Sequence, residues 1–424
     1  MGRSAALVLC ALLVVGAAER ALAAENSVPS SADVRIRYYK ARLGGPGTYP
    51  IYARLGAAYI QKARETGRLR YYREAERYLL RSLEFQPNYE ALHWLSSVYL
   101  AQHRFPEALQ TAEEAVQAMP DSNTLGNLLD AHLAIGDIEK ASGLLARMSE
   151  LQPGFEVSVR RANLQQYHGD LEGARESFLL ACAQADAHAL PVDARAWCQV
   201  RLGSLWLAGC DTERAEAAYR KGLELFPAYP LAQEHIAELR AAQGRAPEAI
   251  QIYRTLLKAN PAPEFRLALA DALELNGRAA DAARQRTRAR RDMQRSVARG
   301  ERVYLRPLAL LLTEDKASAP EALRLAELDW KNRQDAYAAD TLAWAHFANG
   351  HLDEAQRVAE KALSIGTRNP TILLHAARIY HSLGDRERAR TLLARAAACR
   401  EALSPSERAA EDELGAELLQ GGKR

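Results

Sequence analysis

Small and apolar residues recur along the chain at helical spacing, in a pattern that repeats about every 34 residues. Ten alanines mark this repeat, and seven of the nine intervals between them are 33 or 34 residues while the other two are 40 and 41 residues (Ala75, Ala108, Ala141, Ala174, Ala215, Ala249, Ala282, Ala322, Ala355 and Ala389). Each helix pair of such an array has an apolar face that it can bury only against its neighbours. The pattern therefore predicts a solenoid of stacked helix pairs.

The unit over residues 89–122 shows the pattern clearly. Apolar and small residues predict a first helix, a turn follows at His103 and Arg104, and a second helix ends at Pro120. The small residues Ser96 and Ala108 allow the two helices to approach closely, and proline cannot continue a helix. A strand-rich fold is not expected, because β-branched and aromatic residues are few.

This unit resembles the tetratricopeptide repeat, in which a large residue, Leu, a small residue, Tyr, Ala, an aromatic residue, Ala and Pro stand at set places. The match recurs at residues 198–227, 234–261 and 340–363, and a glycine separates the paired helices in six units (Gly136, Gly169, Gly244, Gly277, Gly350 and Gly384). The resemblance implies an all-α, right-handed superhelical solenoid of about ten repeats. More narrowly, the chain resembles exported bacterial tetratricopeptide-repeat proteins that carry no catalytic module.

The sequence predicts five segments: a signal peptide (1–23), a disordered or loosely docked lead-in (24–48), repeats 1–7 ending in a long basic helix (49–302), repeats 8–10 (303–402), and a capping helix with a tail (403–424). Arg3 precedes an apolar stretch over residues 5–18 that is too short to span a bilayer, and Ala21-Leu22-Ala23 fits a cleavage site. We expect export, to the periplasm or outside the cell; an uncleaved anchor is the alternative.

Cysteine spacing leaves two interpretations open for one pair. Cys182 and Cys198 end one predicted helix and begin the next, so they can meet as a disulfide or pack as buried free thiols. Cys198 and Cys210 lie on one predicted helix, about 18 Å apart along its axis, which is too far for a bond. The net charge of +3 gives no indication of nucleic acid or of a membrane surface as a partner of the whole molecule.

The resemblance also implies that the first helix of each unit lines a concave groove. By the repeat register, the residues expected to face a ligand there are Asn127, Asp130, Arg160, Asn163, Arg201, His235, Trp344 and Arg378, with Glu238, Asp271 and Phe347 also on this face. In some family members, Lys, Arg and Asn at such positions hold the terminal carboxylate of a peptide; here the lysines are missing. The alternative is that these positions are ordinary solvated helix faces.

A second candidate surface is basic. Residues 284–306 contain nine arginines, and the narrow apolar stripe of Ala282, Ala289, Met293 and Val297 predicts a docked helix with outward guanidinium groups. An outward arginine row (Arg288, Arg290, Arg291 and Arg295) suits an anionic glycan or a lipid head group. A solvated charged face is the alternative.

Motifs for catalysis were not found: the sequence has no phosphate-binding loop, no Gly-x-Ser-x-Gly and no His-Glu-x-x-His. We therefore expect no catalytic residues, no metal and no cofactor. The sequence favours a non-catalytic scaffold of the cell envelope that binds a protein or peptide in its groove, with no nucleic acid and with a membrane reached only through a partner. The alternatives are an accessory subunit that uses the arginine row, or an unrecognised enzyme.

Overall fold

The computed structural model describes residues 31–44, 48–364 and 366–420, and every regular element in these ranges is a helix. Five helix pairs form the first half: α4 (Tyr49–Thr66) with α5 (Arg70–Phe85), α6 (Tyr89–Ala101) with α7 (Phe105–Ala118), α8 (Ser122–Ala134) with α9 (Ile138–Leu151), α10 (Phe155–Tyr167) with α11 (Leu171–Ala187), and α12 (Val192–Ala208) with α13 (Thr212–Leu225). The predicted signal peptide, residues 1–23, lies outside the described residues.

Five further pairs follow: α14 (Pro230–Ala242) with α15 (Ala246–Ala259), α16 (Pro263–Leu275) with α17 (Ala279–Ala298), α18 (Leu305–Leu312) with α19 (Ala319–Asn332), α20 (Ala336–Ala348) with α21 (Leu352–Ser364), and α22 (Pro370–Ser382) with α23 (Arg386–Ala397). Single helices flank the ten pairs, α3 (Ala32–Lys40) before them and α24 (Pro405–Gln420) after them. Two short 3-10 helices, Lys316–Ser318 and Arg400–Ala402, interrupt the connections. The all-helical solenoid expected from the sequence is confirmed.

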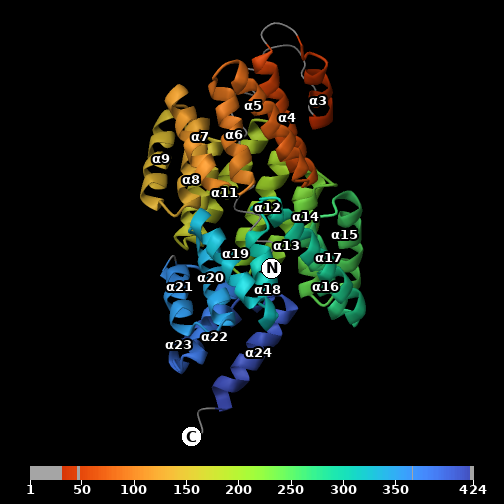
Figure 1. The fold of residues 1–424 in the computed structure, drawn as a ribbon, viewed down its shortest axis with the longest axis vertical. Helices are drawn as coiled ribbons and strands as arrows, with labels where there is room; N and C mark the ends of the chain where they lie inside the picture. Colours follow the sequence, from red (N-terminus) through yellow and green to blue (C-terminus); the bar gives the residue numbers. More distant parts are fainter. Residues whose placement is uncertain (1–30, 45–47, 365, 421–424) are drawn as a thin grey trace.

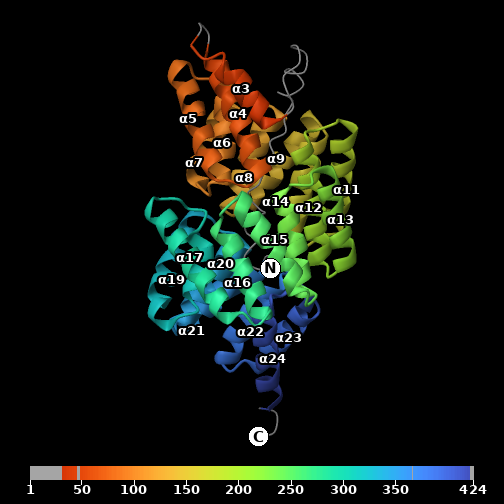
Figure 2. The same ribbon diagram turned by 90° about the vertical axis from the view of Figure 1, so that its right-hand side faces the viewer.

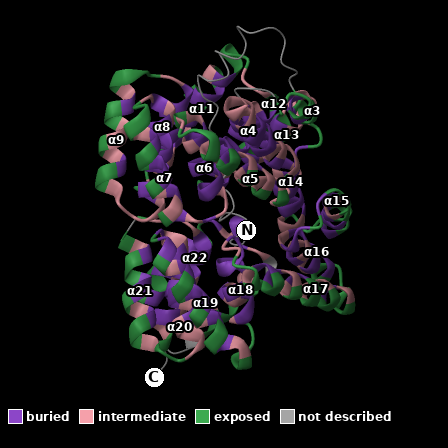
Figure 3. Ribbon diagram, turned by 45° about the horizontal axis from the view of Figure 1, so that its top comes forward, coloured by how far each residue is buried: buried purple, intermediate pink, exposed green. Residues whose placement is uncertain are grey.

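The repeat register is confirmed by burial. All ten alanines of the sequence repeat have an exposed fraction of 0%. Each lies near the start of the second helix of its pair, where a methyl group is all that the crossing of two helices accommodates. In Figure 3 the buried residues follow the sides of the helices that face neighbouring helices, and exposed residues follow the outer faces. Apolar burial between successive pairs therefore holds the stack together.

A recurring turn links the two helices of most pairs. A residue in the left-handed region ends the first helix, and in four pairs an aspartate then caps the second, as at Gly169–Asp170 and Gly384–Asp385. The carboxylate of Asp170 accepts a hydrogen bond from the backbone N–H of Gly173 at 2.9 Å, which satisfies a free donor at the helix start. Cys210 adopts the same left-handed conformation (φ 66°), although it has a side chain.

The solenoid winds into a superhelix whose successive turns touch, and we call this line of contacts the inter-turn seam (Figures 1 and 2). The turn of the first pair meets the end of α15, where Arg68 Nε donates to Ala259 O at 2.9 Å and Asn260 Nδ2 donates to Gly67 O at 3.1 Å. The donor and acceptor residues of these two hydrogen bonds lie 191 and 193 positions apart in the chain. The loops of one superhelical turn thus pack against those of the next turn.

The seam continues around the molecule. The backbone N–H of Gln334 donates to Ala134 O at 3.0 Å. At Gly169 the turns are so close that a Cβ atom would stand 2.7 Å from the carbonyl oxygen of Gly366. Arg408 Nη1 of α24 donates to Ala242 O at 3.0 Å. Glycine at position 169 is therefore required both for its left-handed backbone and for this close approach.

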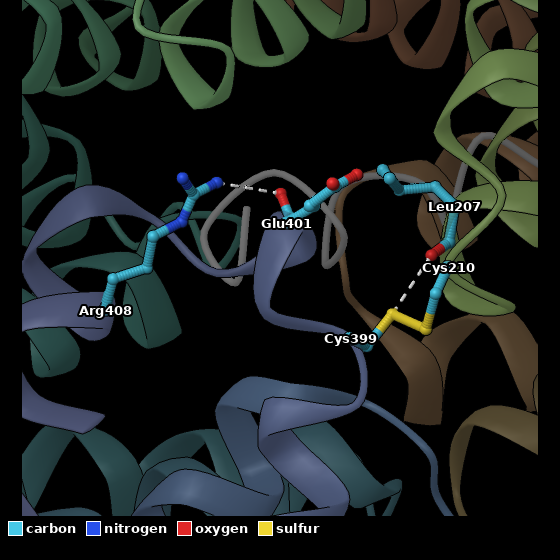
Figure 4. The surroundings of a disulfide bond; sticks show 5 residues. All are labelled: Leu207, Cys210, Cys399, Glu401 and Arg408. Carbon is cyan, nitrogen blue, oxygen red and sulfur yellow. Dashed lines mark hydrogen bonds between the residues drawn. A yellow bond between two sulfur atoms is a disulfide. The ribbon is translucent and has the colours of Figure 1, made fainter. Parts of the chain in front are cut away.

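A disulfide forms one link of the inter-turn seam. Cys210, in the turn between α12 and α13, is bonded to Cys399, after α23, with a Cα–Cα distance of 5.1 Å and a sequence separation of 189 residues (Figure 4). Beside it, Cys399 Sγ lies 3.5 Å from the carbonyl oxygen of Leu207. Cys182 and Cys198 do meet, as buried free thiols with their sulfur atoms 3.0 Å apart.

The ends of the array differ in part from expectation. The prediction of a disordered or loosely docked lead-in is wrong for residues 32–40, which form α3 and bury Ile36 and Tyr39 against α4. Arg35 Nη1 donates to Gln61 Oε1 at 2.8 Å in this contact. At the other end α24 packs on α22 and α23 and also reaches α16, so it lies across the inner side of the last repeats.

Candidate functional site

The groove residues predicted in repeats 3 to 5 are bonded within the protein, and all of them except the partly buried Asn163 are buried. The Asn127 side chain has an exposed fraction of 0%, and its Nδ2 donates to His93 O at 2.8 Å, Ser96 Oγ at 2.7 Å and Ser97 Oγ at 2.8 Å. These partners all lie on α6, one repeat earlier. Asn127 therefore joins two neighbouring inner helices instead of facing a ligand.

Arg160 lies at the centre of a buried ion cluster. Its Nη2 donates to Asp130 Oδ2 at 2.7 Å, and its Nη1 bonds to the Glu156 carboxylate, while its own exposed fraction is 1%. The guanidinium occupies the space above Gly126, where a Cβ atom would stand 2.5 Å from its central carbon. Burial raises the pKa of Asp130 to about 6 even though Arg160 is paired with it.

Arg201 and Asn163 form the next link of this inner network. Arg201 Nη2 donates to Asn163 Oδ1 at 3.1 Å and to Gln166 Oε1 at 2.9 Å. Burial lowers the pKa of the Arg201 guanidinium to about 10. A small cavity of about 120 Å³ separates this region from Tyr337, at the start of α20 one turn later. His235 is also buried, with Nδ1 at 2.8 Å from Glu238 Oε2.

The expectation that these side chains face an open groove is wrong for Asn127, Asp130, Arg160, Arg201 and His235, all of them buried. The physical reason is the close packing of successive inner helices, such as α6 with α8 and α8 with α10, which encloses these side chains so that their polar groups pair with one another. Whether any of them touches a partner stays a prediction.

An open part of the concave face remains in repeats 6 to 10. A cavity of about 490 Å³ is lined by the inner helices α14, α16, α18, α20 and α22 and by the start of α24. Figures 1 and 3 show α16 and α22 on opposite sides of α18, so the cavity has two walls. Trp344 and Arg378, both predicted from the repeat register, line it.

The wall formed by α20 and α22 is aromatic. The Trp344 ring stacks on the His375 ring with centroids 4.1 Å apart and an interplanar angle of 11°, and Phe347 stacks on Trp344 at 4.9 Å. His375 Nδ1 lies 2.9 Å from Asp340 Oδ1, which fixes the orientation of the imidazole ring. The Arg378 guanidinium stands 5.5 Å from the Trp344 centroid. This wall offers a flat surface with one ordered hydrogen-bonding ring.

The wall formed by α14 and α16 bears carboxylates (Glu238, Glu264, Asp271 and Glu274). Burial raises the pKa of Glu264 to about 7, against smaller opposing effects of its own backbone N–H and of the Tyr304 hydroxyl. The Oε2 atom of Glu264 is buried without a hydrogen-bond partner. Arg286 reaches this wall from α17, where its Nη2 donates to Asp271 Oδ1 at 2.9 Å and also bonds to Glu274. The two walls therefore differ in charge and in chemistry.

The arginine row lies on α17, and the apolar stripe beneath it packs as expected, with Ala282, Ala289 and Met293 buried. Arg288, Arg291 and Arg295 are exposed, although Arg295 stands 3.9 Å from Asp292, whereas Arg290 Nη2 donates to Ser318 Oγ at 2.6 Å. Other arginines of residues 284–306 are engaged by carboxylates or buried. The row is therefore shorter than the sequence suggested.

Membrane and metal features were also sought. None of the described helices combines the length and apolar character needed to cross a membrane. In the same part of the chain, no three His, Cys, Asp or Glu side chains gather closely enough to hold a metal ion.

Comparison with known proteins agrees with the repeat architecture. Two sequence profiles described as tetratricopeptide repeat match the chain, one at residues 346–401 and the other at residues 60–123, 200–262 and 236–291. Among solved structures, the yeast Tom70 crystal structure is 15% identical, with a TM-score of 0.36 and coverage of 86% of this chain and 96% of Tom70. No curated protein matches the chain.

A second solved structure, TTC0263, a thermophilic tetratricopeptide-repeat protein of Thermus thermophilus, is 22% identical, with a TM-score of 0.37 and coverage of 42% of this chain and 92% of that protein. The chain belongs to the tetratricopeptide-repeat superfamily. It is accordingly a protein-interaction scaffold, of a repeat family that is generally non-catalytic.

Two residues of this site, and the pairing of two cysteines in the inter-turn seam, were not found by the sequence analysis. Asp340 and His375 stand one repeat apart on neighbouring inner helices, so the register that selected Trp344 and Arg378 could also have selected them. Cys210 had a visible signal, because it occupies the turn position that is glycine in six other units. Its partner Cys399 had none, since nothing local relates residues 189 positions apart.

Proposed function

We propose that this protein is an exported scaffold of the cell envelope that binds a segment of a protein partner in the cavity of repeats 6 to 10. The observation that carries the proposal is the cavity of about 490 Å³ on the concave face, where Trp344 and Arg378 line the wall opposite the carboxylates of α16. Cavities of this size with an aromatic wall and a few oriented polar groups are typical of binding sites.

Export is supported by the signal-like pattern of residues 1–23 and by the Cys210–Cys399 bond, because disulfides persist in oxidising compartments. Cell fractionation and N-terminal sequencing test this part. We expect the mature chain in the envelope or secreted fraction with Ala24 as its first residue. A chain that stays in the cytoplasm with its N-terminal segment intact overturns it.

The groove is tested by affinity capture from the envelope fraction, with Trp344→Ala compared with wild type. Trp206→Ala is the matched control, because Trp206 is also half-buried and also has arginines over its ring, at 4.7 Å, but does not line the cavity. We expect capture of discrete proteins that the Trp344 variant loses and the Trp206 variant keeps. Equal capture by both variants overturns the assignment of the groove.

The second candidate is binding of an anionic glycan or lipid head group by the α17 arginine row. Exposure of Arg288 and Arg291 on one helix favours it. Changing Arg288, Arg291 and Arg295 to Ser should then remove the salt-sensitive part of the capture while leaving the Trp344-dependent part intact. If the salt concentration does not change what the wild-type protein captures, this candidate function is contradicted.

A further inference from the structure

Charge distinguishes the cavity of repeats 6 to 10 from the rest of the molecule. The whole chain has a net charge of +3. The cavity, in contrast, is lined by seven carboxylate side chains and three arginines (Glu238, Glu264, Asp271, Glu274, Glu314, Asp340 and Glu407; Arg286, Arg306 and Arg378). An excess of carboxylates within a concave, partly water-excluded space attracts cations more strongly than the same charges on a flat surface.

On α16 the ion pairs leave part of this excess in place. Arg286 is the arginine that reaches the α16 wall, and it is shared between Asp271 and Glu274. Its single charge cannot neutralise both. Asp340 is occupied by His375, which lies between it and the Trp344 face. The α16 wall thus keeps a surplus of negative charge opposite the aromatic wall.

One atom of the α16 wall is not satisfied by the protein. Glu264 Oε2 is buried and has no hydrogen-bond partner, although Glu264 lines the cavity. A buried carboxylate oxygen without a donor is unfavourable, and a bound ammonium or guanidinium group supplies the missing donor together with an opposite charge. The aromatic wall across the cavity offers apolar contact to the rest of such a ligand.

We propose that the cavity selects a cationic segment of its partner, with lysine or arginine side chains held by Glu264 and Glu274 and the intervening residues packed on Trp344. The inference rests on the proposed function, since it specifies the chemistry of the segment that the groove binds. The pairing is electrostatic and desolvated, so it acts on affinity as well as on the rate of encounter.

The probe is a set of three fluorescein-labelled decapeptide mixtures, in which randomised apolar positions alternate with Lys, with Gln or with Glu. Fluorescence anisotropy with the full chain measures their affinities. We expect the Lys mixture to bind most tightly. Glu264→Gln with Glu274→Gln, both isosteric, should weaken it about tenfold. The control pair Glu139→Gln with Glu213→Gln removes the same charge from exposed sites outside the cavity and should change nothing.

The outcomes separate the two proposals. If the Gln or Glu mixture binds tightly and Trp344→Ala abolishes that binding, the assignment of the groove stands and the proposal of a cationic segment is overturned. Equal weakening by the groove pair and the control pair also overturns it, because the effect is then one of overall charge. Binding of no mixture, or binding that ignores Trp344→Ala, overturns the groove itself. Far-UV circular dichroism melts of each variant verify that the fold is intact.

Discussion

The contribution of the inter-turn disulfide to the free energy of unfolding can be worked out from the structure and tested. Cys399→Ser breaks the bond between the α12–α13 turn and the segment after α23, which are 189 residues apart in the chain. Cys399 is 4% exposed, so the serine hydroxyl also replaces sulfur in a buried position. Both effects destabilise the folded state. The bond is the covalent member of the seam, alongside hydrogen bonds such as that of Arg68 with Ala259 and apolar packing such as that of Ala402.

The magnitude follows mainly from the unfolded chain. Closing a loop this long removes entropy from the unfolded state worth about 5 kcal/mol in the chain-entropy model. A repeat array can unfold in parts, in which case less than the whole loop is released in one step. We therefore expect Cys399→Ser to lower the free energy of unfolding by about 2–5 kcal/mol, and the loss to fall on repeats 5 to 10.

The partner cysteine provides an internal control. Cys210 has φ 66°, a conformation that Gly136 and Gly244 adopt at the same turn of other repeats. A side chain there costs about 1 kcal/mol relative to glycine. Cys210→Gly loses the disulfide but also this strain, so it should be more stable than Cys210→Ser by about 1 kcal/mol.

Guanidinium chloride unfolding, followed by far-UV circular dichroism, measures all of these differences. Wild type with reductant should lose most of its advantage over Cys399→Ser and keep only the part due to the buried thiol, and reductant should leave that variant unchanged. If reductant does not move the wild-type midpoint, the seam does not depend on this bond and the reasoning fails. If Cys210→Gly and Cys210→Ser unfold together, the argument from backbone strain is refuted.

Three further substitutions test the core of the repeats by urea unfolding. Ala108→Leu should cost about 1–3 kcal/mol by overpacking, since Ala108 is fully buried between paired helices; a neutral result would place the repeat register elsewhere. Arg160→Met should cost about 3–5 kcal/mol because it leaves the Asp130 carboxylate buried without its partner, and an effect below about 1 kcal/mol would mean that water reaches this cluster. Burial raises the pKa of Asp329 to about 6 from 3.8, so the folded state holds the proton more tightly than the unfolded state and stability falls as pH rises from about 4 to 6. Asp329→Asn should flatten this slope in midpoints measured from pH 4 to 7, whereas an unchanged slope contradicts the assignment.

Local features of the fold were predictable from the sequence because their causes are local. The buried alanine of each unit, as at Ala108, reflects a crossing of two helices that are adjacent in the chain. The glycine found in most of the turns, as at Gly169, reflects a backbone conformation of one residue. An aspartate after it, such as Asp170, reflects a hydrogen bond to a neighbouring N–H. Helix number and register follow from these signals without any knowledge of the distant parts of the chain.

The winding of the superhelix has no such local cause. Its contacts join residues that are distant in the chain, such as Arg68 and Ala259, which are 191 positions apart. The acceptor in this contact is a backbone carbonyl oxygen, which every residue provides. The sequence therefore predicted a concave face correctly, yet could not show which part of it is covered. Asn127 and Trp344 occupy similar places on inner helices and were chosen by one argument, but one is buried and the other borders a cavity.

This difference explains why polarity alone is a poor guide to binding in a tightly wound solenoid. Along α8 to α12 the inner polar side chains are buried between neighbouring inner helices and form pairs there, as Arg160 on α10 does with Asp130 on α8. Of the described helices that follow α22 in the chain, only α24 packs across the inner side of α16 and α22. There a cavity of about 490 Å³ stays open beside Trp344 and Arg378. An inner residue is therefore a better binding candidate when it borders open space than when its type resembles a known clamp, and this criterion selects Trp344 and Arg378 rather than Asn127 and Arg160.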